Sequence, residues 1–441
     1  MMDWDIGIGM ITLIMFGGLF VLLLINVPLA FATGSIAVIS GLLFWGPQAI
    51  RLFPSNIYGM VTGYVFVTVP MFIFMGAVLE RSGITDYLYD AIYRWFGSVR
   101  GCLAITTILV SMLMSAMVGI IGAIIVSMAL IALPAMLKRG YDKSLAMGSI
   151  MAGGSLGVLI PPSIMLIMYG IWAGLSVRRL FLAATMPGIL LGVLFIAYIL
   201  IRAYYNPKLA PPLPEEDRVT LKEKILYLRA LILPALLVFF VLGSIYSGIA
   251  TPTEASGIGA FGAILCALFF GRLNWDLLKH ALSTMMRLSA MVMWIGFGAV
   301  SFVSVYNRLG GVEFVRSSML AIPVEPWVLL VGMMAIVLFL GMIIEWVGII
   351  MLTVPIFVPV AMGLGFDPLW FGILICVNLQ MDVLTPPFGF ALFYMKGVAP
   401  KDVSTWDIYK ASIPFVGLQL AGLILCMIFP QIVLFLPNLI H

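Results

Sequence analysis

Two Pro-Pro pairs inside apolar sequence decide how this chain is organised. The first lies in VLIPP (158–162) and the second in VLTPP (383–387), 225 residues further along. Around each pair, a hydrophobic residue followed by proline, a Gly-aromatic-Asp triplet and a tyrosine recur with the same offset. A shared offset without gaps over the stretch 133–169 is not expected by chance. We therefore predict two homologous halves, each with a helix broken at its Pro-Pro pair.

The composition places these halves in a membrane. Of the 441 residues, 63% are hydrophobic and 10% are charged, whereas a soluble domain carries about a quarter charged residues. This balance excludes a soluble globular enzyme, a disordered chain, collagen and a disulfide scaffold. A helix that crosses the bilayer takes about 20 apolar residues, so ten or more crossings fit. The net charge of +4 comes from residues between apolar runs, which indicates control of membrane topology and no nucleic-acid binding.

The expected fold is an all-α integral membrane protein of about ten transmembrane helices, two re-entrant hairpins and two Pro-Pro-broken helices. A first repeat spans 1–206, a cytoplasmic linker spans 207–224 and a second repeat spans 225–441. Each repeat contains three helices, a hairpin, a broken helix and a last helix. The expected helices are 6–28, 31–50, 57–80, 180–204, 225–249, 253–271, 280–307 and 404–437. The expected hairpins are 101–138 and 326–362, and the broken helices are 142–175 and 368–396.

The charges around the hairpins predict that the two repeats are inverted. Arg100 lies before the first hairpin, and Lys138 and Arg139 lie at its end, so both ends should be cytoplasmic. Glu325 and Asp367 flank the second hairpin, which should therefore open to the outside. Matching elements that enter from opposite faces are a feature of transporters. The same count places both termini in the periplasm.

The breaks are where we expect the chemistry. Two adjacent prolines remove two backbone donors from a helix, and irregular backbone at membrane depth is tolerated where it is buried or lines a polar cavity. Half-helix C-termini and free carbonyls suit Na⁺, and half-helix N-termini suit a carboxylate. The simpler alternative is that the prolines only kink packed helices. The candidate Na⁺ ligands are Ser115, Gly119, Gly122, Pro161, Gly341, Glu345, Thr385 and Pro386. The candidate substrate ligands are Ser163, Tyr169, Asn378 and Asp382.

Some of these residues have a structural alternative. Serine in an apolar helix commonly bonds its own backbone, which applies to Ser115. Glu345 and Asp382 are intramembrane carboxylates, which favours a functional role. Their alternatives are pairing with a backbone amide and an interfacial position. An integral-membrane enzyme is a remote alternative, because the sequence has no acid–base or nucleophile cluster and only two histidines. No P-loop motif occurs, so transport would run on an ion gradient. We expect no cofactor, with Na⁺ as coupling ion.

Four runs of sequence carry a family resemblance. They are PMFIFMGAVLERSGI (70–84), ALPAMLKRGYDKSLAMGSIMAGGSLGVLIPPSIMLIMYG (132–170), GIATPTEASGIGAFGA (248–263) and VNLQMDVLTPPFGFALFY (377–394). Together they resemble the large (DctM-like) membrane subunit of tripartite ATP-independent periplasmic (TRAP) transporters, over nearly the whole chain. Many members have an acidic residue where Gln380 stands, so the chain departs from the family there.

The resemblance implies a function and partners. It implies an elevator-type, Na⁺-coupled importer of organic anions in the bacterial inner membrane. A small four-helix membrane subunit would support it in the lipid bilayer, and a periplasmic binding protein would deliver the substrate. The alternative within transport is a stand-alone anion:cation symporter of similar inverted-repeat architecture.

Overall fold

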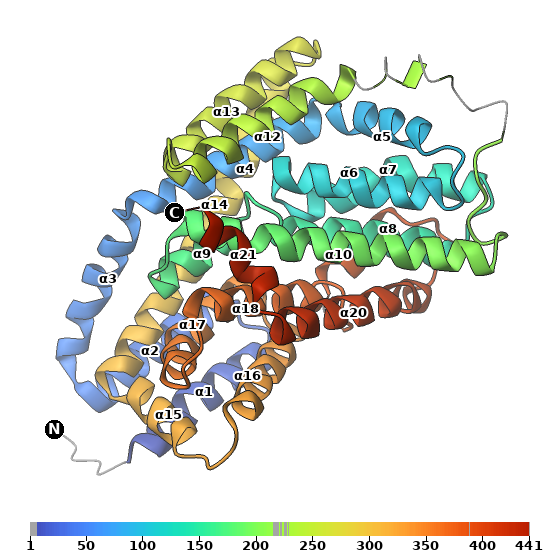
Figure 1. The fold of residues 1–441 in the computed structure, drawn as a ribbon. Helices are drawn as coiled ribbons and strands as arrows, with labels where there is room; N and C mark the ends of the chain where they lie inside the picture. The colour runs from blue at the N-terminus through green and yellow to red at the C-terminus, as the bar shows by residue number, and fades with distance from the viewer. Residues whose placement is uncertain are drawn as a thin grey trace.

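The chain folds as an array of helices, seen in a computed structural model (Figure 1). Seven of the described helices are long and apolar enough to cross a membrane, and shorter apolar helices accompany them. The expectation of an all-helical chain with membrane-length helices is therefore confirmed. No β-strand occurs within the described residues, which are 7–214, 220, 223–224, 227, 229–387 and 389–440.

The helices form two groups that are joined by two short connecting helices. The lateral group consists of α1 (Ile8–Leu24), α2 (Leu29–Ser40), α3 (Leu52–Val61), α4 (Thr68–Arg81), α12 (Arg229–Ser247), α13 (Pro252–Phe269) and α14 (Trp275–Arg308). The central group consists of α6 (Cys102–Val118), α7 (Ile121–Lys138), α8 (Lys143–Ser155), α9 (Ile164–Ala173), α10 (Val177–Tyr205), α16 (Pro326–Gly341), α17 (Trp346–Gly363), α18 (Pro368–Asp382), α19 (Phe390–Val398), α20 (Thr405–Ile428) and α21 (Gln431–Leu439). The connecting helices are α5 (Ile84–Trp95) and α15 (Gly311–Leu320). In Figure 1, α6, α7, α8, α10 and α20 of the central group lie side by side.

Helix boundaries in the central group follow from local chemistry that repeats at the 225-residue offset. Gly140 and Gly365 both have a positive φ, of 77° and 86°, which glycine adopts without a Cβ penalty at the end of a helix. Two residues later, Asp142 accepts a hydrogen bond from Leu145 N at 2.9 Å, and Asp367 accepts bonds from the first turn of α18. The Gly-aromatic-Asp triplets therefore end one helix and cap the next.

Short breaks separate four pairs of helices in the central group. The arms α6 and α7 contact each other and are separated by Gly119 and Ile120, while α16 and α17 are separated by residues 342–345. The starts of α7 and α17, at Ile121 and Trp346, differ by the same 225 residues. The Pro-Pro segments interrupt α8–α9 and α18–α19, and both Pro-Pro bonds are cis.

Contacts between the two parts of the chain are reciprocal. Helix α7 packs on α19, while their counterparts α17 and α9 pack on each other; α8 packs on α20, and α18 packs on α10. In the lateral group, α2 packs on α14 and α13 packs on α4. Ser155 even contacts its own counterpart Gln380, through a 3.3 Å hydrogen bond. Helices that correspond at the 225-residue offset thus exchange packing partners.

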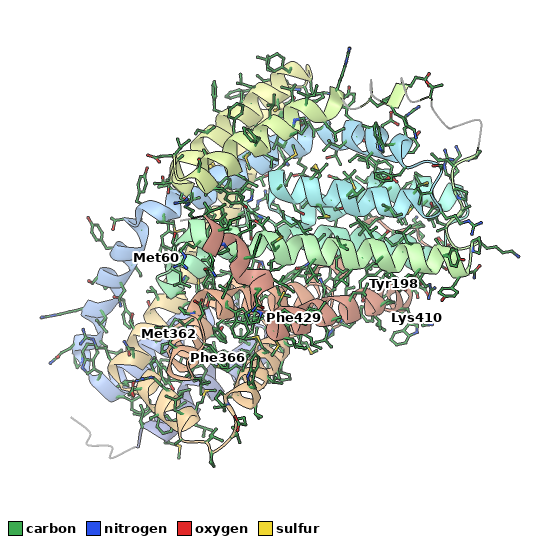
Figure 2. All side chains as sticks on the ribbon, viewed as in Figure 1. Met60, Tyr198, Met362, Phe366, Lys410 and Phe429 are labelled. Carbon is green, nitrogen blue, oxygen red and sulfur yellow. The ribbon has the colours of Figure 1, made fainter. Side chains whose placement is uncertain are left out.

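Close backbone contact holds the lateral group together. A Cβ added to Gly298 of α14 would lie 2.3 Å from the backbone oxygen of Ala30 in α2, and Gly34 also faces Gly298. Small residues at helix contacts are how apolar helices approach closely in lipid. Met60 of α3, labelled in Figure 2, covers Gly296 of α14.

Three expected helices differ from the structure in extent. The helix expected at 57–80 is broken at Thr62 and Gly63 into α3 and α4, because glycine has a low helix propensity. The α-helix expected at 31–50 ends at Ser40. The chain continues as a π-helical turn and a 3₁₀ turn on either side of Gly46, whose φ is 87°. The helix expected at 404–437 bends at Phe429 (Figure 2), because Pro430 lacks a backbone donor.

In the middle of the chain, one helix begins earlier than expected and the expected linker is described only in part. Helix α14 begins at Trp275, before the expected residue 280, because Asn274 caps it by accepting a 2.8 Å bond from Leu277 N. With 34 residues, it is about 51 Å long and exceeds the bilayer core of about 30 Å. The expected linker 207–224 and the start of the helix expected at 225 lie partly outside the described residues.

Candidate functional site

A cavity of about 250 Å³ lies where all four breaks of the central group meet the lateral helices α4 and α14. The central group contributes Gly119, Ile120, Ile121, Gly122, Val158, Ser163, Ile164, Met165, Glu345, Trp346, Phe390 and Tyr394. The lateral group contributes Ile73, Leu288, Met291 and Val292. Both hairpin tips and both broken helices therefore share one cavity, although they are far apart in the sequence.

Four helix N-termini converge on this cavity. Its lining includes Ile121, Ile164, Trp346 and Phe390, the first residues of α7, α9, α17 and α19. The first backbone N–H groups of a helix have no partner within the helix, and the helix dipole places partial positive charge there. No side chain caps α7, α17 or α19. An anion in the cavity would therefore meet the electrostatic environment that helix N-termini offer to phosphates and carboxylates.

Glu345 is the only charged side chain among the described residues that line the cavity. It is partly buried and occupies the N-cap position of α17 without bonding the first turn. Its carboxylate would repel an anionic ligand in the same small space. A cation between the two groups would remove this repulsion, so the cavity has the means to couple an anion to a cation.

The two hydroxyl-bearing residues that line the cavity, Ser163 and Tyr394, have different roles. Ser163 caps α9: its hydroxyl donates to Val158 O and accepts from Leu166 N at 3.4 Å. The ring of Tyr394 lies against Gly122, where an added Cβ would approach its Cζ to 2.7 Å. The hydroxyl of Ser163 is therefore occupied in holding the break, and the Tyr394 ring closes the space beside the first tip.

The first hairpin tip is held tightly between two neighbours. Gly119 has a φ of 61°, and a Cβ there would lie 3.0 Å from Pro162 O of the broken helix. On the other side, a Cβ on Gly76 of α4 would lie 2.3 Å from Val118 O, the last carbonyl oxygen of α6. The tip thus touches both the Pro-Pro segment and the lateral group.

The structure brings four of the twelve predicted site residues to the cavity. They are Gly119, Gly122, Ser163 and Glu345. Pro161 is buried in the first Pro-Pro segment, and Pro386 is in the second. The remaining six residues are Ser115, Tyr169, Gly341, Asn378, Asp382 and Thr385, which do not line it.

Two of these six use their hydroxyls within their own segments. Ser115 donates to Ser111 O at 2.7 Å. This is the bond to the backbone of its own helix that was expected as the alternative to a role in Na⁺ binding. Thr385 donates to Met381 O at 2.7 Å. A hydroxyl oxygen that donates one bond still has lone pairs for a cation.

The other four pack between helices of the central group. Tyr169 is fully buried against Gly372 of α18, and Asn378 Nδ2 donates to Met334 O of α16 at 2.7 Å. Asp382 lies against Gly341, and its Oδ2 is buried without a hydrogen-bond partner.

Tyr394 and a buried polar cluster are not among the site residues that the sequence predicts. Tyr394 recurs at the offset of Tyr169, so the repeat contained a signal for it. In the cluster, Gln380 Nε2 and Gln419 Nε2 donate to Ser155 Oγ at 3.3 and 3.1 Å, and all three side chains are fully buried. A single glutamine in the apolar sequence of α20 offered no signal for this contact.

Comparison with known proteins identifies the family. The family described as "Tripartite ATP-independent periplasmic transporter, DctM component" matches residues 16–432. The chain belongs to this family. It is therefore a multi-pass membrane transport protein, and its family forms part of tripartite systems.

Several relatives of this TRAP permease have named substrates. The C4-dicarboxylate TRAP transporter large permease protein DctM of Pseudomonas aeruginosa is 32% identical over 90% of this chain and 92% of its own length. The sialic acid TRAP transporter large permease protein SiaM of Vibrio cholerae is 29% identical over 95% and 96%. The ectoine/5-hydroxyectoine permease UehC of Ruegeria pomeroyi is also 29% identical, over 95% and 97%.

A solved structure shares the fold. The Alcanivorax borkumensis YdaH transporter superposes with a TM-score of 0.65 at 17% identity, covering 94% of this chain and 98% of its own. At this identity the likeness concerns the fold alone. It supports a membrane-transporter architecture for the helical array.

Proposed function

We propose that this permease carries small organic anions into the cell together with Na⁺. The observation that carries the proposal is the cavity, where four helix N-termini surround one carboxylate, Glu345. The N-termini suit the substrate carboxylate, and Glu345 suits a cation. Because the two ligands neutralise each other, each raises the affinity for the other, as linkage requires.

The remaining roles follow from this arrangement. The anion binds in the cavity beside Ser163. Na⁺ binds near Glu345 and near the two breaks, with the carbonyl groups and hydroxyls of the candidate cation residues as ligands. The two repeats are inverted, the central group moves against the lateral group as an elevator, and both termini are periplasmic. The chain works in the bacterial inner membrane with a small four-helix subunit, and a periplasmic binding protein hands over the substrate.

Reconstitution tests the coupling. The chain is placed in liposomes with the small subunit and binding protein of its system, and uptake of a radiolabelled carboxylate is followed. We expect uptake with an inward Na⁺ gradient and none when K⁺ replaces Na⁺. Uptake that is indifferent to Na⁺ would contradict the coupling, and full activity of this chain alone would favour the stand-alone symporter.

Glu345→Gln tests the proposed cation site with little change in shape. The variant should bind the carboxylate with an affinity that no longer depends on Na⁺, because the charge that attracts the cation is gone. Glu313→Gln is the matched control, since Glu313 is an exposed acid in α15 that pairs with Arg316. If both variants retain the Na⁺ dependence of the unmodified protein, Glu345 does not hold the cation.

A further inference from the structure

We infer that the transported anion is a monocarboxylate with an apolar body, and not a dicarboxylate or a polyhydroxylated acid. This inference rests on the anion transport proposed above. It concerns the part of the cavity that faces the rest of the substrate once its carboxylate lies at the helix N-termini.

The wall contributed by the lateral helices is entirely apolar. It consists of Ile73 from α4 and of Leu288, Met291 and Val292 from α14. A second carboxylate or a row of hydroxyls against this wall would lose water without gaining a partner, which is unfavourable for a hydroxyl and far more so for a charge. An aliphatic or aromatic body would gain from leaving water.

The rest of the lining has no cationic group for a second carboxylate. No lysine, arginine or histidine occurs among the described lining residues. The carboxylate of Glu345 would repel a second negative charge, and the hydroxyl of Ser163 already bonds Val158 O and Leu166 N. The side-chain donors left over are the hydroxyl of Tyr394 and the indole N–H of Trp346. These are too few for a sugar acid, whose hydroxyls each need a partner.

The volume limits the size of the substrate. A cavity of about 250 Å³ has room for several water molecules. This accommodates a carboxylic acid of roughly eight to ten non-hydrogen atoms, such as hexanoate or benzoate. Succinate and malate are similar in size, so polarity and not volume would separate these two pairs of acids.

Direct binding to the purified full chain tests the inference without the selectivity of a binding protein. Calorimetric titrations in NaCl and in KCl use hexanoate, benzoate, succinate and malate as probes. We expect Na⁺-dependent binding of hexanoate and benzoate that is at least about tenfold tighter than that of succinate and malate. Na⁺-dependent binding in which succinate equals or exceeds hexanoate would overturn the inference alone. Absence of Na⁺-dependent binding for all four acids would overturn the proposed function.

A gain of selectivity provides a second test. Met291→Arg places a cation on the apolar wall, where it can pair with a second carboxylate. It should raise the affinity for succinate relative to hexanoate by about tenfold. Met286→Arg is the matched control, because Met286 is exposed on the same helix and outside the cavity lining. An unchanged ratio in a folded Met291→Arg protein, or an equal shift in both variants, would contradict the assigned wall.

Discussion

Replacing Gly76 with alanine probes the contact between α4 and the first hairpin tip. The added Cβ would lie 2.3 Å from Val118 O and 3.0 Å from the Val118 carbonyl carbon. Ordinary contacts of a Cβ begin near 3.4 Å, so α4 and the tip must separate by roughly 1 Å, which is overpacking at a cost of about 1–3 kcal/mol. The clash is with backbone, so a change of side chain at Val118 cannot relieve it.

Gly257→Ala isolates this cost from helix propensity. Gly257 lies in α13, and nothing lies within 4 Å of a Cβ added there. Both substitutions gain up to about 1 kcal/mol from the preference of helices for alanine. The difference between the two variants is therefore the clash, and we expect Gly76→Ala to unfold at a lower temperature than Gly257→Ala by a few °C.

Two measurements check this prediction. Thermal unfolding in detergent, followed by tryptophan fluorescence, reports the difference in stability. If the contact is made in only one of the states of the transport cycle, the same cost alters their ratio by about 5- to 150-fold, and initial uptake rates of Gly76→Ala should fall. Equal melting temperatures and equal uptake rates for the two variants would refute the close approach of α4 to the tip.

Three further changes have defined outcomes. Ser155→Ala leaves two buried N–H groups without their acceptor and should destabilise the protein by about 1–3 kcal/mol; adding Gln419→Leu should recover part of this loss in thermal unfolding. The hydrogen bond from Lys143 lowers the pKa of Asp402, so the stabilisation by Asp402 should be present above about pH 3.9 and lost as the pH falls through the lowered value. Melting curves between about pH 7 and pH 3 should show a larger loss for the unmodified protein than for Asp402→Asn. Thr385→Ala should weaken the Na⁺ activation of uptake if the second break binds a cation, and an unchanged activation curve in a well-expressed variant would exclude that role.

Helix positions in the central group follow from prolines, glycines and capping aspartates that can be recognised in the sequence. The Pro-Pro pairs interrupt helices because they lack backbone donors, and Gly140 with Asp142 ends one helix and starts the next. The 225-residue offset therefore predicts matching boundaries in the second part of the chain. The helices expected at 57–80 and 404–437 are interrupted at Gly63 and Pro430, where a single local breaker stands within a long apolar run.

The environment of each polar side chain is decided by packing between distant segments. Ser115 and Asp382 resemble ligands as isolated residues in apolar sequence, yet the first bonds its own helix and the second packs against Gly341. Glu345 reaches the cavity because the second hairpin places it beside the starts of three other helices. No local pattern encodes that neighbourhood.

Composition and periodic breaks thus account for a membrane protein of two related parts, because hydrophobicity and missing backbone donors act within a few residues along the chain. The convergence of four helix N-termini on Glu345, the apolar wall around Met291 and the contact of Gly76 with Val118 exist only in the folded chain. Each depends on which helix faces which, and that is determined by the shape and small residues of surfaces that are tens to hundreds of residues apart in sequence.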